Sequence, residues 1–201
     1  AMYSVTSGGS NVAVGKNALM LNTTGEENVA VGAIALDANT TGIKNTALGR
    51  SALGSNTTSD HNTSVGYNSL LANTSGEQNT AVGSRCLEAN QTTSNNVAVG
   101  YEALASNITS NNTAVGWQAG KENTSGTGIT AIGRRALLNN TSGINNTAVG
   151  YQAASTQTTP SNNTAIGYNA LQQTTNGSEN TAVGSQALEA NQTGLRNTAV
   201  G

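Results

Sequence analysis

Residues 28–44 read NVAVGAIALDANTTGIK, and residues 45–61 read NTALGRSALGSNTTSDH. The two stretches have the same length, and both place Asn, Ala, Gly, Ala-Leu and Asn-Thr-Thr at the same positions. This pattern recurs along the whole chain every seventeen residues, except for one interval of sixteen between Gly100 and Gly116. The glycine that closes each motif is found at Gly15, Gly32, Gly49, Gly66, Gly83, Gly100, Gly116, Gly133, Gly150, Gly167, Gly184 and Gly201. The chain is therefore a tandem array, and the repeat decides its fold.

The residues before each glycine predict a short β-strand. Val or Ile precedes the glycine in every copy except Leu48, and Ala precedes that residue except at Ser64. Thr or Val comes next, and Asn starts the motif except at Ile129. β-Branched residues in period-2 alternation are typical of strands, so the motif has a Val/Thr face and an Ala/Asn face.

An Ala-Leu segment follows the glycine by three residues. We expect a strand here too, because so short a repeat leaves no uninterrupted stretch of helix-forming residues that is long enough for a helix. Gly120 and Ala154 replace the Leu of this segment, so the coils around them are predicted to pack less well.

An Asn-Thr-Thr-Gly or Asn-Thr-Ser-Gly turn ends the unit. Its polar side chains bond to nearby backbone and its glycine permits positive φ. Pro160 replaces that glycine in one copy, which predicts a different turn type there. The shortened interval loses its residue in this region, near Asn107–Asn111.

Such a unit cannot bury its apolar side alone, so identical units are expected to stack. The predicted fold is all-β: a β-solenoid or β-roll of 17-residue coils, with Val, Asn and Thr each in ladders, and a length on the order of 50 Å from about 4.8 Å per coil. Residues 1–10 are interpreted as a lead-in in which Ala1-Met2 is a cloning remnant, and residues 11–201 as a single array of about eleven units. Both ends are expected to be cut from a longer protein.

Composition limits the classes of function. Only 9% of residues are charged, the net charge is −2, and the eight Lys and Arg form no basic stripe, so nucleic acid is not an expected partner. No apolar run approaches the roughly 20 residues that span a bilayer, so no membrane insertion is expected. There is no Phe and little large apolar volume. The fold must therefore be thin, and the second strand face is predicted to pack against a partner chain.

The Asn-Thr-Ala-Val-Gly motif with its following Ala-Leu resembles the head repeats of trimeric autotransporter adhesins, and also repeats of bacteriophage tail-fibre shafts. The resemblance covers residues 11–201, although the adhesin heads have a shorter unit. It implies a parallel homotrimer of packed or intertwined β-rolls. It also implies an extracellular location, on a virion tail fibre or a bacterial outer surface, and attachment to a host-surface glycan or protein receptor.

No residue set predicts catalysis, a metal site or a cofactor. Cys86 occupies an alanine position and is interpreted as a small buried residue, while His61 stands in a variable turn position. Metal sites need several ligands at defined spacing, and polysaccharide hydrolysis needs paired carboxylates, which the sequence lacks. We therefore predict that the chain is not an enzyme. The many Asn-x-Ser/Thr triplets match glycosylation acceptors, but turn chemistry accounts for them.

One position after the strand glycine carries large side chains in several copies. A surface contact row is predicted at Tyr67, Tyr101, Trp117, Tyr151 and Tyr168, with Lys16, Arg50 and Arg134 at the same position in other copies. The row could contact sugars or a partner, or it could simply cover the corner of each coil.

An alternative function remains open alongside the fibre. Regular Thr and Asn ladders on a monomeric β-solenoid would suit ice binding, although Val interrupts the main Thr column at Val12, Val29 and Val97.

Overall fold

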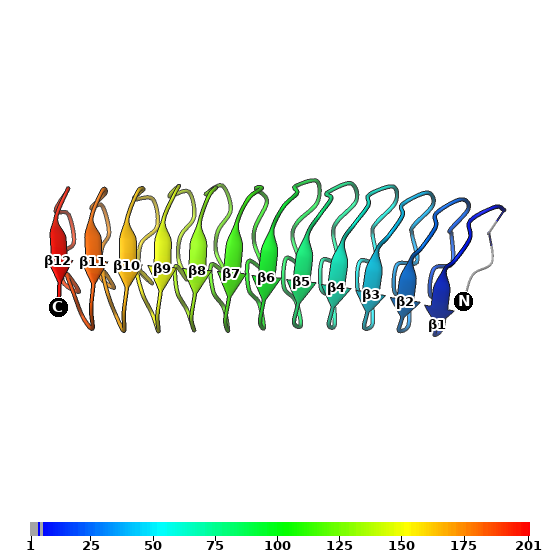
Figure 1. Cartoon of the computed structure of the whole chain (residues 1–201), viewed down its shortest axis with the longest axis horizontal. Helices are drawn as coiled ribbons and strands as arrows, with labels where there is room; N and C mark the ends of the chain where they lie inside the picture. The colour runs from blue at the N-terminus through cyan, green and yellow to red at the C-terminus, as the bar shows by residue number, and fades with distance from the viewer. Residues whose placement is uncertain (1–3, 5) are drawn as a thin grey trace. The chain divides into compact units, whose positions relative to one another are not determined.

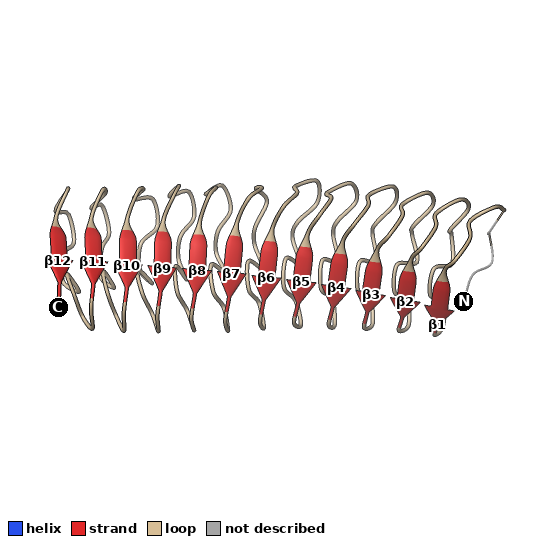
Figure 2. Ribbon diagram, in the orientation of Figure 1, coloured by secondary structure: helices blue, strands red, loops and turns tan. Residues whose placement is uncertain are grey.

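The computed structural model describes Ser4 and residues 6–201, so the interpretation of Ala1-Met2 lies outside the described residues. The chain is all-β, a parallel β-solenoid of about eleven coils, each one repeat long, and the described residues contain no helix (Figures 1 and 2). The predicted fold class is confirmed. The chain divides into two compact units, Ala1–Val99 and Gly100–Gly201, each described by itself below.

Each unit contains one three-residue strand per coil, and neighbouring strands in the sequence pair in parallel. The strands of the first unit are β1 (Val12–Val14), β2 (Val29–Val31), β3 (Thr46–Leu48), β4 (Thr63–Val65), β5 (Thr80–Val82) and β6 (Val97–Val99). The strands of the second unit are β7 (Thr113–Val115), β8 (Thr130–Ile132), β9 (Thr147–Val149), β10 (Thr164–Ile166), β11 (Thr181–Val183) and β12 (Thr198–Val200).

The pairing register places equivalent residues of the repeat beside each other. Ala13 pairs with Ala30 in the first unit, and Ala148 with Ala165 in the second. The predicted ladders of identical residues are therefore confirmed within each unit. This register follows from the constant repeat length, because a shift by one residue would turn every side chain to the opposite side of the sheet.

The middle residue of each strand points inward. Ala30 and Ala47 are fully buried, while the first and third residues of their strands are partly exposed. We call the exposed first and third residues of the strands the strand face. Alanine suits the inward position because the core is thin and the Ala-Leu segment of the same coil fills its other side.

The Ala-Leu segment is a turn and not a strand, so that prediction is wrong. Ala35 and Leu36 are neighbours in the sequence, yet both are fully buried. An extended strand would send consecutive side chains to opposite sides. Instead Ile34 and Leu36 adopt φ of 51° and 50°, and this left-handed backbone curls the segment so that Ala and Leu both point inward. The Leu36 N–H still bonds to the next coil, at Ala52 O, 3.0 Å away.

Asparagine forms buried ladders. In the first unit Asn39 Nδ2 donates to Asn22 Oδ1 at 2.8 Å, and Asn56 Nδ2 donates to Asn39 Oδ1 at 2.8 Å. A second ladder runs through the Asn that precedes each strand of the first unit, where the Asn45 N–H donates to Asn28 Oδ1 at 2.9 Å. These side chains are fully buried, and each one forms hydrogen bonds with the Asn of a neighbouring coil. A buried amide group requires such partners.

The turn glycine is favoured by the tight space and not by positive φ. Gly25 has no positive φ, but a Cβ there would lie 2.4 Å from Gly42 O. The positive φ falls two residues later, at Glu27 (56°). Pro160 therefore fits without a change in turn type, contrary to the prediction. The Pro160 carbonyl accepts a hydrogen bond from Gln157 Nε2 at 2.9 Å, just as Gly25 O accepts one from Asn22 Nδ2.

The shortened coil loses its residue inside the turn, as predicted. Asn107 Nδ2 donates to Thr109 O, two residues ahead, whereas the equivalent Asn123 donates to Gly126 O, three residues ahead. The ladder continues through the deletion, because Asn123 Nδ2 still reaches Asn107 Oδ1 at 2.8 Å.

The space under Gly120 is filled by Leu104 of the preceding coil and by Ile129, which starts the next repeat unit. A Cβ at Gly120 would meet Ile129 Cδ1 at 3.4 Å and Leu104 Cδ2 at 3.1 Å. Ile129, which stands where other coils have Asn, is 1% exposed. The predicted packing defect at Gly120 is thus compensated by a second departure from the repeat.

Candidate functional site

The strand glycine directs the following side chain to the surface. Gly116 has a φ of 135°, and a Cβ there would lie 2.6 Å from Gly133 O of the next coil. Only glycine fits so close to neighbouring backbone. Trp117 and Tyr151, which follow strand glycines, are both exposed by more than a third, as are the other three members of the predicted row.

The structure brings three members of that row together in the second unit. Tyr151 and Tyr168 stack with ring centroids 5.4 Å apart and 12° between their planes. The Arg134 guanidinium lies 4.8 Å from the Trp117 ring centroid and 5.3 Å from that of Tyr151. Arg134 Nη1 also donates to the Tyr151 hydroxyl at 2.7 Å. The side chains therefore form one continuous stack over four successive coils.

A second guanidinium joins this stack from the next residue. Arg135 lies 4.9 Å from the Trp117 centroid, and its Nε donates to Gln118 Oε1 at 3.4 Å. The sequence reasoning missed Arg135 and did not assign Arg134 a role in the stack. The spacing held a signal for Arg134, because it stands one repeat from both Trp117 and Tyr151. We call Trp117, Arg134, Arg135, Tyr151 and Tyr168 the arginine–aromatic cluster.

The other two members of the row stand outside this cluster. Tyr67 lies in the first unit, where the Arg50 guanidinium is 5.8 Å from its ring centroid. Tyr101 lies in the second unit, and within the described part of the chain its ring makes no aromatic contact. The predicted row is therefore one cluster, one Arg-Tyr pair and one separate tyrosine.

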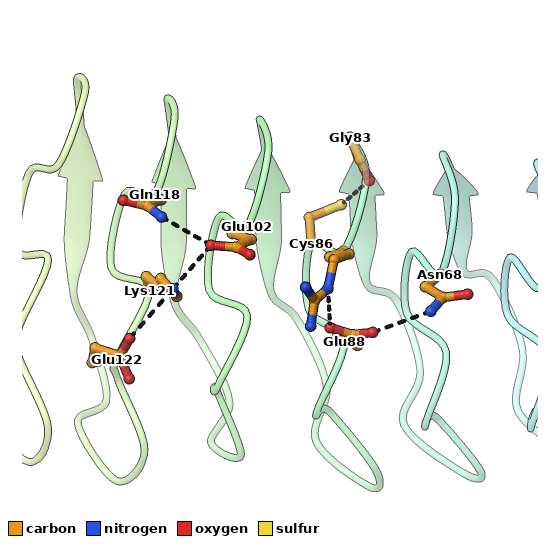
Figure 3. Close-up of polar contacts among 9 residues, drawn as sticks. Asn68, Gly83, Cys86, Glu88, Glu102, Gln118, Lys121 and Glu122 are labelled. Atoms are coloured by element: carbon orange, nitrogen blue, oxygen red, sulfur yellow. Dashed lines mark hydrogen bonds and ion pairs between the residues drawn. The ribbon is translucent and has the colours of Figure 1, made fainter.

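Beside the cluster, the buried Glu102 forms an ion pair with the partly exposed Lys121. Lys121 Nζ lies 2.9 Å from Glu102 Oε2, and Gln118 Nε2 donates to the same oxygen at 2.9 Å (Figure 3). Burial opposes ionisation of Glu102, but the hydrogen bonds from Lys121 and Gln118 outweigh it and lower the pKa of that carboxyl. The group is charged at neutral pH and already paired, so it offers no general acid or base.

Cys86 and His61 occupy the places that the repeat assigned to them. Cys86 is fully buried, and its thiol donates to Gly83 O at 2.9 Å (Figure 3). Burial raises the pKa of this thiol to about 11, which suppresses the nucleophilic thiolate. His61 is exposed, and its N–H donates to Ile43 O at 3.1 Å. Neither residue forms a nucleophile–base pair.

Folding conceals the turn asparagines of the glycosylation triplets. Asn22 and Asn39 are fully buried, and the Asn39 Nδ2 atom that a glycan would need donates to Asn22 Oδ1 and Gly42 O. These triplets are therefore structural in the folded chain.

The residues that the structure describes contain no group of three potential metal ligands, no pocket, and no helix that is long and apolar enough to cross a bilayer. The two surfaces that stand out are the strand face and the arginine–aromatic cluster. Compared with known proteins, the chain matches no family model, no curated protein and no solved structure.

Proposed function

We propose that this chain is a segment of a homotrimeric fibre in which the strand faces of three parallel copies pack together. The fibre would serve attachment at a host surface, as part of a virion tail fibre or a bacterial outer-surface adhesin. The role is structural, with no enzymatic step. The single observation that carries the proposal is the apolar strand face. The third residue of every described strand, which lies on this face, is Val, Ile or Leu.

These side chains are too exposed for a surface that faces only water. Leu48 in the first unit and Ile132 and Ile166 in the second are each 39% exposed. Contiguous apolar patches on proteins mark interaction sites, since their burial is favourable by roughly 25 cal/mol per Å².

The periodicity of the strand face favours a second copy of this chain as its occupant. The face repeats once per coil, so a partner that fits at one coil fits at the next only if it has the same repeat. Parallel copies in register meet this condition at every coil. The small Val and Thr side chains also permit close approach. The number three comes from the resemblance to trimeric fibre repeats.

Sedimentation equilibrium at micromolar concentration tests the assembly. We expect three times the chain mass of 20.1 kDa, and a clean monomer would contradict the proposal. The variant Ile132→Glu with Ile166→Glu places charges on the strand face and should yield monomers. The control Ile144→Glu with Leu195→Glu changes two exposed turn residues, 39% and 60% exposed, and should remain trimeric.

Ice binding by a monomer is the second candidate, and the strand face also supports it. Thr46, Thr63 and Thr80 lie in register with one another, so the face offers a regular Thr row beside its Val row. The Asn ladders cannot take part because they are buried. A thermal hysteresis measurement decides: ice growth inhibition by a monomeric sample would favour this candidate over the fibre, and its absence would dismiss it.

A further inference from the structure

The arginine–aromatic cluster carries positive charge without an acidic partner. Within the part of the second unit that the structure describes, no carboxylate lies within ion-pair distance of Arg134 or Arg135, whereas Arg196 pairs with Glu179 at 2.9 Å. We propose that this cluster binds an acidic polysaccharide through the carboxylates of the sugar chain. The proposal goes beyond the fibre role and does not depend on it, because all the residues come from one chain.

Two guanidinium groups share one indole. Arg134 and Arg135 lie 4.8 and 4.9 Å from the Trp117 centroid, so two like charges approach the same ring. Their mutual repulsion is relieved when an anion binds both. A carboxylate matches the planar fork of a guanidinium and accepts two parallel hydrogen bonds from it.

The position of Arg134 is fixed before any ligand arrives. Its guanidinium lies between the rings of Trp117 and Tyr151, and one of its five N–H donors already bonds to the Tyr151 hydroxyl. The remaining donors are available to a ligand. Since the side chain is already ordered, binding loses less conformational entropy than it would at a free surface arginine.

The shape of the cluster favours a linear sugar chain. Trp117, Tyr151 and Tyr168 line the surface across successive coils, so a polymer can lie along them while a single small anion would contact only one end. Single-stranded nucleic acid would need free ring faces for base stacking. Here Arg134 covers faces of Trp117 and Tyr151, and Tyr151 and Tyr168 cover each other. The exposed edges and hydroxyls suit hydrogen bonding to sugars.

Tryptophan fluorescence tests the proposal directly, because Trp117 is the only tryptophan in the chain. We expect titration of the full chain with an oligogalacturonate to change the emission with saturation, and added salt to weaken the binding. A neutral oligoglucose of the same length should produce no saturable change. Arg134→Gln should raise the Kd by roughly tenfold or more, because a hydrogen-bonded charge is lost.

Arg196→Gln is the matched control, since it removes the same charge from an exposed arginine of the same unit and should change the Kd less than twofold. Arg135→Gln provides a second test of the cluster, and circular dichroism verifies that each variant is folded. Three results would overturn the proposal: no saturable signal with oligogalacturonate, equal binding of the neutral sugar, or equal loss in the Arg134 and Arg196 variants. Tighter binding of oligothymidylate than of oligogalacturonate would also overturn it, in favour of a nucleic-acid site.

Discussion

At the residue scale, departures from the repeat show what each position requires. Cys86 and Ser69 both replace alanine in the buried Ala-Leu segment, and Ser69 Oγ lies 3.3 Å from Cys86 Sγ. Ser64 replaces the inward strand alanine and donates its hydroxyl to Ser69 O at 2.7 Å. The thin core of the first unit therefore admits small polar groups only where each finds a hydrogen-bonding partner.

The Cys86 thiol makes stability fall at alkaline pH. The folded pKa is raised to about 11, so the unfolded thiol ionises first as the pH rises and the stabilisation is lost between the two pKa values. Between pH 8 and pH 10 the natural chain should lose about 1 kcal/mol more unfolding free energy than Cys86→Ala. Denaturant unfolding at both pH values measures this, and other titrating groups cancel in the comparison. Equal losses would contradict the prediction.

Thr174 interrupts an asparagine ladder in the second unit. It is fully buried, and its Oγ1 has no hydrogen-bonding partner. Thr174→Asn should restore the bond to the carbonyl of Gly177 and stabilise the coil by about 1 kcal/mol. Slower amide hydrogen exchange in this coil would report the gain. Thr175→Asn, at an exposed neighbour, is the control and should leave exchange unchanged. Faster exchange in Thr174→Asn would mean that the site cannot accommodate the amide.

At the scale of the element, one coil supplies one layer of the core. Its strand contributes one inward Ala, its Ala-Leu segment contributes a buried Ala and a buried Leu, and two buried Asn side chains complete the layer. Residues of consecutive repeat units that meet in the core therefore compensate for each other, as Gly120 and Ile129 do.

That compensation predicts energetic coupling. Ile129→Asn alone should cost about 2 kcal/mol, the order expected for a buried cavity, because the Ile129 side chain no longer helps to fill the space under Gly120. Gly120→Leu alone should overpack against Ile129 and cost about 1–3 kcal/mol. The double variant recreates the common Leu and Asn pair and should be nearly as stable as the natural chain. Denaturant unfolding of all four proteins gives the coupling, and additive effects would refute it.

At the scale of the whole molecule, stability arises from contacts between successive coils, as in other repeat proteins. Charged side chains contribute little, because only 9% of residues are charged and exposed ion pairs such as Arg196–Glu179 stabilise weakly. Ladders of hydrogen bonds and methyl groups repeat at every coil instead. The number of coils thus matters less for folding than the alignment of equivalent residues in neighbouring coils.

Removal of one whole repeat tests this view. Deletion of residues 45–61 joins Lys44 to Asn62 and keeps every ladder in register. We expect the variant to fold, with an unchanged circular dichroism spectrum and a slightly lower Tm. Deletion of residues 45–53 alone removes about half a coil and should abolish cooperative folding, because equivalent residues no longer meet. Cooperative melting of the shorter deletion at a similar temperature would contradict the register argument.

The sequence by itself determined the coil length, the parallel stacking, the Asn ladders and the burial of Cys86, because each is imposed by the repeat on every copy alike. It also located the large side chains after the strand glycines. Only the tertiary structure decided three matters. Leu36 and its equivalents turn inward together with the preceding Ala through left-handed backbone, which side-chain periodicity does not encode. The Val/Thr face of the strand became the outer one, because the thin core accepts only small side chains such as Ala and Ser64. Arg134 and Arg135 converged on Trp117, because stacking brings residues of successive repeats into direct contact.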